Sequence, residues 1–181
     1  MNRVSVDKKA LASETERNGE GFDSVFARTL SGEDFRAPPS HVKTVDMIPA
    51  PLVRQCFDFD CGCACLQSIL RMFGFNLRSE FVVRALRMSS EDLIDCHMVS
   101  DFLSCFSIDA FETEMNDIHE LEKYLQKSRP AMTAIQAWGG KSEMDALESG
   151  HFVLCTGCDE ENIYFMDPSV LGNYGFLPKK E

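Results

Sequence analysis

Four cysteines lie between positions 56 and 65, directly before an apolar segment that ends at Gly74. Cys61 has the most suggestive position of the four, because Gly62 follows it and a helix is predicted to begin there. The free N–H groups and the dipole at a helix start stabilise an anion, so a thiol in this place forms a thiolate more readily. The sequence therefore makes Cys61 a candidate nucleophile.

A thiolate nucleophile also needs a nearby base, and hydrogen-bond donors for the oxyanion that develops on its substrate. Gln55 lies six residues before Cys61 and carries a neutral amide donor. His151 begins one predicted strand, and Asp167 ends the next one. We expect these four residues to form one catalytic site, with Gln136 as an alternative amide donor.

The two predicted strands suggest how His151 and Asp167 would meet. If the turn between the strands centres on Asp159, then Val153 pairs with Phe165, and His151 lies directly opposite Asp167. Directly opposed residues have Cβ atoms roughly 4.5–5.5 Å apart. The carboxylate could then hold the imidazole in one tautomer, as the third member of a triad does. A slip of one residue would place the two side chains on opposite faces.

The remaining cysteines raise the question of a metal site. Cys155 and Cys158 have a spacing that zinc sites use, but Cys155 falls inside a predicted strand. Cys61 and Cys63 are two residues apart on a helix, so their side chains point in different directions. We therefore expect no bound metal and no other cofactor. Cys65 lies one turn after Cys61 and could trap its oxidised form as a disulfide, although packing is the simpler role.

The chain as a whole divides into a polar arm and one domain. Residues 1–45 are polar and of mixed charge, which predicts a flexible arm, although the apolar spacing of residues 22–30 could also dock on the domain. Residues 46–181 are predicted to form that domain. Its helical patterns come first and its strand patterns follow, which indicates an α+β fold with a largely antiparallel sheet. The predicted helices span 61–73, 80–88, 98–106 and 116–127, the last capped by Asn116, and the predicted strands span 130–138, 151–157 and 162–168, with a short one at 107–114.

Composition and charge narrow the function classes. The chain has 181 residues and a net charge of -11, so it repels phosphate backbones, and nucleic acid is not an expected partner. No apolar run approaches the roughly 18 residues that span a bilayer, and the N-terminus has no apolar signal region. We therefore expect a cytoplasmic protein, without a membrane partner, whose thiols stay reduced.

Taken together, these motifs resemble a known family. The segment QCFDFDCGCACLQSIL, followed by IQAWGG and by GHFVLCTGCDEENIYFMDPS, is similar to papain-like cysteine peptidases. More narrowly, it is similar to the bacteriocin-processing peptidases, which cleave double-glycine leader peptides. The resemblance covers about residues 47–178 and implies a papain-like fold, in which an N-terminal helical part with the nucleophile helix packs on a C-terminal antiparallel sheet. It implies these roles: nucleophile for Cys61, general base and acid for His151, orienting carboxylate for Asp167 and oxyanion donor for Gln55.

The function that the resemblance implies is hydrolysis of a peptide or isopeptide bond in a peptide or protein substrate, through an acyl-enzyme. Acyl transfer to an amine or thiol needs the same residues, and a non-catalytic peptide-binding relative is a further alternative. A small metal-binding adaptor is a third class, which the poor convergence of the cysteines disfavours.

Two departures from the family pattern bear on activity. Cys63 stands where a proline or another residue is common, and relatives usually continue with another helix where this chain stops at Glu181. The short end leaves a weakened enzyme as an alternative. A eukaryotic group named as guanylyl cyclase-like shares the pattern DCG-x-AC-x4-LR-x2-G, but no phosphate-cradling glycine-rich loop is found, so cyclase chemistry is not expected.

Overall fold

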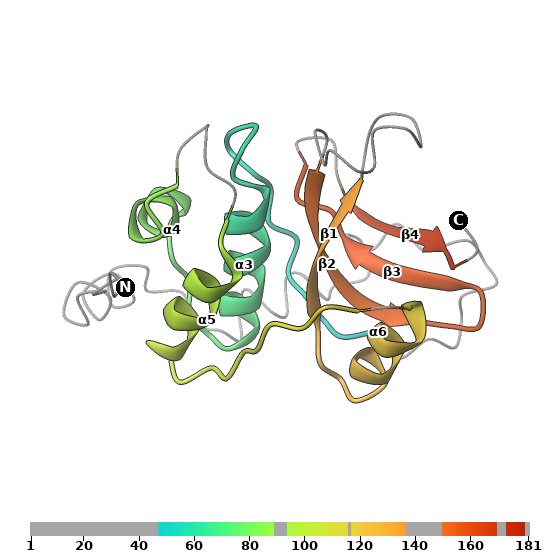
Figure 1. Cartoon of the computed structure of the whole chain (residues 1–181). Coiled ribbons are helices and arrows are strands. Elements are labelled where there is room, and N and C mark those ends of the chain that lie inside the picture. The colour runs from blue at the N-terminus through green and yellow to red at the C-terminus, as the bar shows by residue number, and fades with distance from the viewer. Residues whose placement is uncertain (1–46, 89–93, 116, 137–149, 170–172, 180–181) are drawn as a thin grey trace.

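The computed structural model describes residues 47–88, 94–115, 117–136, 150–169 and 173–179, which form a helical part and a sheet lying side by side (Figure 1). The arm predicted at residues 1–45, with its apolar segment 22–30, lies outside the described residues. Helices come before strands along the chain, which confirms the predicted α+β fold. The helices are α3 (Cys61–Met72), α4 (Ser79–Ala85), α5 (Cys96–Ser104) and α6 (Ile118–Leu125), and the strands are β1 (Ala131–Gln136), β2 (Gly150–Cys158), β3 (Asn162–Met166) and β4 (Tyr174–Pro178).

Helix α3 is the central helix of the helical part. All of its residues from Cys61 to Leu70 are buried, because small and apolar side chains let neighbouring elements approach from every side. Its apolar face shares one core cluster with Leu154 of β2 and Met166 of β3. The chain leaves the helix at Gly74, whose φ of 85° lies in the region that glycine adopts without strain. Packing of α3 against β2 fixes the position of Cys61 relative to the sheet.

Helix α6 begins at a different cap from the predicted one. The N-cap residue is Asp117, whose carboxylate accepts the N–H groups of His119 at 2.6 Å and of Glu120 at 3.3 Å. The prediction of Asn116 as the cap was therefore wrong by one residue. An aspartate satisfies the free N–H groups as an asparagine would, and its charge also interacts favourably with the helix dipole.

The four strands form one sheet in the order β1-β2-β3-β4, and every neighbouring pair is antiparallel. Successive side chains of β2 alternate between two core clusters: Leu154 packs with α3, whereas Val153 and Cys155 pack with Leu121 and Leu125 of α6. The sheet therefore lies between the helical part and α6. Strand β4 was not among the strands predicted from local pattern, because its residues are exposed or half-buried and lack apolar alternation.

The predicted strand at residues 107–114 was wrong. Residues 108–115 have no regular secondary structure and cross from α5 toward α6 (Figure 1). Only Ile108 of this segment is buried, while residues 109–115 are exposed. A strand needs a neighbouring strand to satisfy its backbone groups, and the sheet pairs β1 with β2 instead.

Residues 47–55 hold the two parts together. The N–H of Ile48 donates to the carbonyl of Thr156 in β2 at 2.7 Å. The hydroxyl of Ser68 in α3 donates to the carbonyl of Pro51 at 2.7 Å. This extended segment therefore contacts the middle of the sheet first and α3 next, before it reaches the loop that precedes Cys61. Within the described residues, no helix has the length and apolar character needed to cross a bilayer.

Candidate active site

Cys61 is the first residue of α3 and is 9% exposed. Its neighbour Gly62 packs so closely that an added Cβ would lie 2.8 Å from Cγ2 of Ile94 and 3.2 Å from Cε of Met132. Glycine at position 62 therefore lets the start of α3 lie between Ile94 and Met132 of β1. The N-cap residue Asp60 makes no side-chain hydrogen bond to the first N–H groups of α3, and the backbone of Gly62 makes a hydrogen bond with the Cys61 thiol.

His151 contacts Asp167 as expected, but through a different strand register. The Nε2 atom of His151 lies 2.8 Å from Oδ1 of Asp167. The predicted pairing of Val153 with Phe165 was wrong, since Phe165 pairs with Cys155, and the register shifts again between Cys155 and Gly157. Continued one residue beyond β3, this register places Asp167 opposite Val153. His151 is then a diagonal neighbour on the same face, within reach of a long side chain.

The imidazole of His151 connects the carboxylate to the thiol. His151 is 5% exposed and makes a side-chain hydrogen bond with Cys61. Because Nε2 faces Asp167, Nδ1 is the nitrogen left for the sulfur. The structure thus brings three of the predicted site residues together: Cys61 at the start of α3, His151 in β2 and Asp167 directly after β3.

The electrostatics of this site shift the pKa values of both Cys61 and His151 toward their charged forms. Burial raises the pKa of the Cys61 thiol, but the hydrogen bonds from His151 and from the Phe152 and Gly62 backbone outweigh it, so the pKa is below its ordinary value. The hydrogen bond with Cys61 raises the pKa of His151, burial opposes this, and the bond to Asp167 adds to the rise. A thiolate and an imidazolium that stabilise each other lower the pKa of the thiol and raise that of the imidazole.

Ser169 is a residue of the site that sequence reasoning missed. Its N–H donates to Oδ1 of Asp167 at 2.8 Å, and its hydroxyl donates to Oδ2 at 3.0 Å. Burial raises the pKa of Asp167, but the bonds from Ser169 and His151 lower it below its ordinary value. The signal was present in the sequence, because an aspartate followed two residues later by a serine is a common side-chain-to-backbone turn.

Gln55 lies beside the end of β3 but is engaged within its own loop. Its backbone N–H donates to the carbonyl of Pro168 at 2.7 Å, which joins the helical part to the turn after β3. Its side-chain Nε2 donates to the carbonyl of Phe57 at 2.8 Å, and this leaves one N–H of the amide group for another acceptor. Gln136, the alternative donor, ends β1 opposite Gly150.

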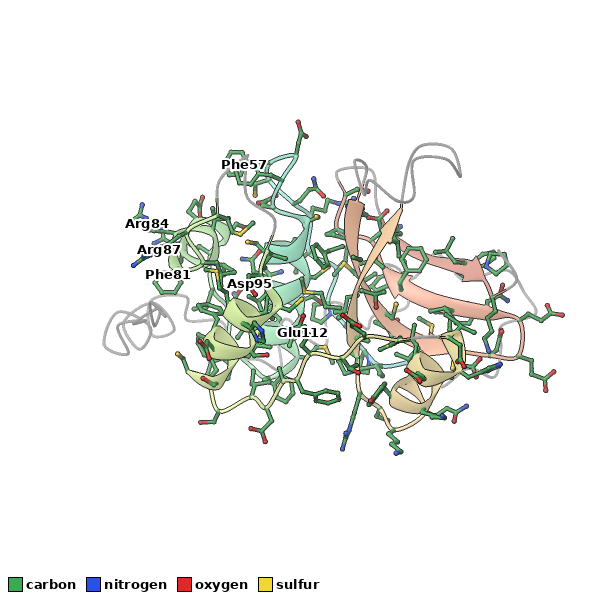
Figure 2. All side chains as sticks on the ribbon, viewed as in Figure 1. Phe57, Phe81, Arg84, Arg87, Asp95 and Glu112 are labelled. Atoms are coloured by element: carbon green, nitrogen blue, oxygen red, sulfur yellow. The ribbon has the colours of Figure 1, made fainter. Side chains whose placement is uncertain are left out.

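The loop between Gln55 and Cys61 is held by Asp60, which sequence reasoning also missed. Asp60 is 1% exposed, and its carboxylate accepts the N–H groups of Cys56 at 3.1 Å and of Phe57 at 2.9 Å. Figure 2 shows Phe57 on this loop, beyond the first turn of α3. These two backbone hydrogen bonds satisfy the buried side chain of Asp60 and fix the shape of the loop.

Residues 50–175 match the sequence model described as the Peptidase C39 family. The chain belongs to the peptidase C39 family. This membership confirms the resemblance to bacteriocin-processing, papain-like peptidases, and family members are cysteine peptidases.

The solved structures support the same fold for this C39-family chain. One similar structure is the peptidase domain of Streptococcus ComA, described as a bi-functional ABC transporter involved in a quorum sensing pathway. The similarity has a TM-score of 0.54 at 18% sequence identity, and it covers 71% of this chain and 86% of that one. At this identity the likeness shows the fold alone. No curated protein matches the sequence.

The other cysteines of the C39-family chain differ from Cys61 in their surroundings. All eight cysteines are free thiols. Burial raises the pKa of Cys63 to about 12 and of Cys155 to about 11. Cys65 is fully buried, and its thiol donates to the carbonyl of Phe152 at 3.5 Å. Among the described residues, no three histidine, cysteine or acidic side chains gather in a way that could hold a metal ion.

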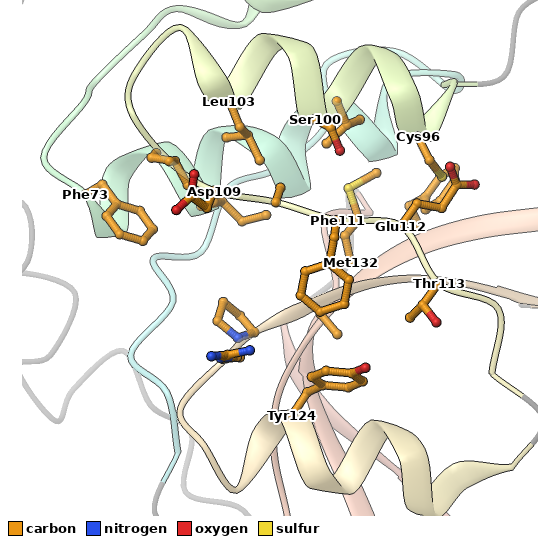
Figure 3. A pocket seen from close by; sticks show the side chains of 18 of the residues that line it. Phe73, Cys96, Ser100, Leu103, Asp109, Phe111, Glu112, Thr113, Tyr124 and Met132 are labelled. Carbon is orange, nitrogen blue, oxygen red and sulfur yellow. The ribbon is translucent and has the colours of Figure 1, made fainter.

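A groove of about 510 Å³ lies between the helical part and the sheet, beside the candidate site rather than at it (Figure 3). Phe111 and Tyr124 form one wall, with ring centroids 5.5 Å apart. Cys61 and His151 do not line the groove, but Phe152, the residue after His151, does. Its lining is largely apolar and includes Phe73, Leu103, Phe111, Tyr124, Met132 and Phe152.

Proposed function

We propose that this protein is a cysteine peptidase that uses Cys61 as nucleophile and cleaves a peptide or isopeptide bond through an acyl-enzyme. The observation that carries the proposal is the line of contacts from the Cys61 thiol through His151 to the Asp167 carboxylate. Three features of a cysteine nucleophile coincide there: a helix start, an adjacent imidazole and a carboxylate that orients the ring. Membership of the peptidase C39 family supports a peptide or protein as substrate.

In the first half-reaction, the Cys61 thiolate attacks the carbonyl carbon of the scissile bond, and the carbonyl oxygen becomes an oxyanion. The second amide N–H of Gln55 and the free N–H groups at the start of α3 are the donors that we assign to this oxyanion. His151, in its protonated form, gives a proton to the leaving nitrogen as the C–N bond breaks. The acyl group then remains on Cys61 as a thioester.

In the second half-reaction, neutral His151 takes a proton from water, and the hydroxide oxygen attacks the thioester carbonyl. The C–S bond breaks, the sulfur leaves as a thiolate, and the acid product is released. Asp167 keeps the ring oriented in both half-reactions and stabilises its charged form. The end state is again a thiolate beside an imidazolium.

Two alternatives share part of this site. Acyl transfer would follow the same first half-reaction, with an amine or thiol replacing water in the second. A non-catalytic peptide-binding role would need none of these contacts, and the lowered pKa of Cys61 argues against it.

The test is hydrolysis of a peptide library that includes double-glycine leader-like sequences, followed by intact-mass detection of the acyl-enzyme. Wild type should cleave a subset of peptides and carry an acyl group on Cys61, whereas Cys61→Ala should do neither. Cys56→Ala is the matched control, because Cys56 is an exposed thiol on the loop that precedes α3. Equal cleavage by wild type and Cys61→Ala would contradict the proposal. So would a wild-type protein that cleaves no peptide and forms no adduct with a peptide-aldehyde probe. Added amines that become the main acyl acceptors would favour acyl transfer.

A further inference from the structure

The turn that follows β3 makes contacts in three directions. Ser169 contacts both oxygens of the Asp167 carboxylate, through its N–H at 2.8 Å and its hydroxyl at 3.0 Å. The carbonyl of Pro168 accepts the backbone N–H of Gln55 at 2.7 Å. The backbone N–H of Asp167 donates to the carbonyl of Asn173 at 2.9 Å, which ties the turn to the chain just before β4.

The carboxylate of Asp167 needs such contacts to stay oriented. The last torsion of an aspartate side chain has a broad preference, so the plane of the carboxylate is not fixed by the chain itself. The side chain of Asp167 is 29% exposed, so water can compete for its oxygens, whereas that of His151 is 6% exposed. Ser169 is the residue that occupies Oδ2 and shares Oδ1 with the imidazole.

We propose that Ser169 is a positioning residue of the active site: its N–H and hydroxyl hold the Asp167 carboxylate in the orientation that His151 requires, on the turn whose Pro168 carbonyl also holds Gln55. This inference rests on the proposed function. Ser169 touches neither the thiol nor the assigned oxyanion donor, and it acts through Asp167. One short turn thus sets the geometry both of the Asp167 carboxylate and of the loop that carries Gln55.

The expected effect of Ser169 on titration follows from the groups that face Asp167. These are His151 from β2 and Cys65 from α3, and Cys61 is linked to Asp167 through the imidazole. Loss of the Ser169 hydroxyl should raise the pKa of Asp167 and weaken its support of the imidazolium. The pKa of His151 should then fall and that of Cys61 should rise, so the pH range in which both are charged becomes narrower at both ends.

The test compares Ser169→Thr with Ser169→Val, two side chains of the same shape that differ in the hydroxyl, together with Ser169→Ala. The rate of Cys61 alkylation by iodoacetamide is mapped by mass spectrometry against pH, and kcat/KM is measured with the best library peptide. Ser169→Val and Ser169→Ala should lower kcat/KM by roughly threefold to thirtyfold and raise the apparent pKa of Cys61 by about half a unit to one unit. Ser169→Thr should stay close to wild type in both measurements. Ser104→Ala, which removes a serine hydroxyl bonded to a backbone carbonyl on α5, is the control that should change neither.

The outcomes separate this inference from the proposed function. Identical alkylation profiles for the Thr and Val variants would overturn the role of Ser169. A lower melting temperature of Ser169→Val without any change in its alkylation profile would overturn it too. Alkylation needs no substrate, so these results are independent of whether the library contains a good peptide. If wild-type Cys61 shows no depressed pKa at all, both the thiol–imidazole pair and the role of Ser169 are overturned.

Discussion

Replacing Asp167 by asparagine removes the charge beside His151 with little change of shape. In the structure, the carboxylate accepts bonds from His151 and Ser169 at 2.8–3.0 Å. An asparagine can keep these contacts, because its carbonyl oxygen accepts from the imidazole and its amide can donate to the serine hydroxyl. We therefore expect Asp167→Asn to fold with a melting temperature close to that of wild type.

The expected loss of activity is the difference between a charged and a neutral partner for the imidazolium. A hydrogen bond to a charged group contributes about 1.5–3 kcal/mol, and a neutral one about 0.5–1.5 kcal/mol. The difference is about 1–2 kcal/mol, and the 29% exposure of the Asp167 side chain places it toward the lower part of that range. Since about 1.36 kcal/mol corresponds to a tenfold change in rate, kcat/KM should fall by about fivefold to tenfold. Cys61→Ala should lose far more.

The pH dependence gives the same prediction a second readout. The pKa of His151 is raised in the folded protein, so its charged form is present at low pH and is lost as pH rises through that pKa. Without the Asp167 charge, this loss should occur at lower pH, and the pKa of Cys61 should rise. The assay is Cys61 alkylation against pH, with Asp101→Asn, an exposed carboxylate on α5, as the control. If Asp167→Asn changes neither turnover nor the alkylation profile, Asp167 does not orient the imidazole, and the reasoning is refuted.

Two further variants test the loop and the helix start. Gln55→Ala should lower kcat by about a hundredfold with little change in KM or in the alkylation profile of Cys61, as expected for the loss of one oxyanion donor; a change confined to KM would assign Gln55 to substrate binding instead. Gly62→Ala should lower the free energy of unfolding by about 1–3 kcal/mol through overpacking, because the added carbon would lie 2.8 Å from Ile94. Chemical denaturation measures this change, and an unaltered midpoint would show that the neighbouring side chains move aside without strain.

Much of the fold could be predicted because its signals are local. The helix that begins at Cys61 was predicted to end at Phe73 and ends one residue earlier, since apolar spacing and Gly74 define it. The described ends of strands β1, β2 and β3 each lie within two residues of the predicted ends. Helices and strands of this kind follow from periodicity and turn residues alone.

The errors arose where distant contacts decide the structure. The strand register depends on an irregularity between Cys155 and Gly157 that has no signal of its own in the sequence. The register differed by two residues rather than one, and this is why His151 and Asp167 still share a face. The exposed strand β4 forms because β3 offers it an edge, not because its residues alternate.

Contacts within the candidate site could be predicted in part from the sequence. The residue types and spacing of Cys61, His151 and Asp167 pointed to one site before any geometry was known. The contact of Ser169 with Asp167 is local and could have been anticipated from its spacing. The hydrogen bonds of the Asp60 side chain to the preceding loop could not have been anticipated, because an aspartate before a helix is ordinarily expected to cap that helix.

The most direct test of the account is competition among the eight cysteines for limiting iodoacetamide at about pH 6, read by mass mapping. Cys56 is exposed and Cys61 is 9% exposed, so accessibility alone would favour Cys56. Paired with His151, Cys61 should nevertheless be labelled first, and His151→Ala should abolish that preference. Preferential labelling of Cys56 in wild type, or a preference for Cys61 that survives His151→Ala, would contradict the claim that the imidazole activates this thiol.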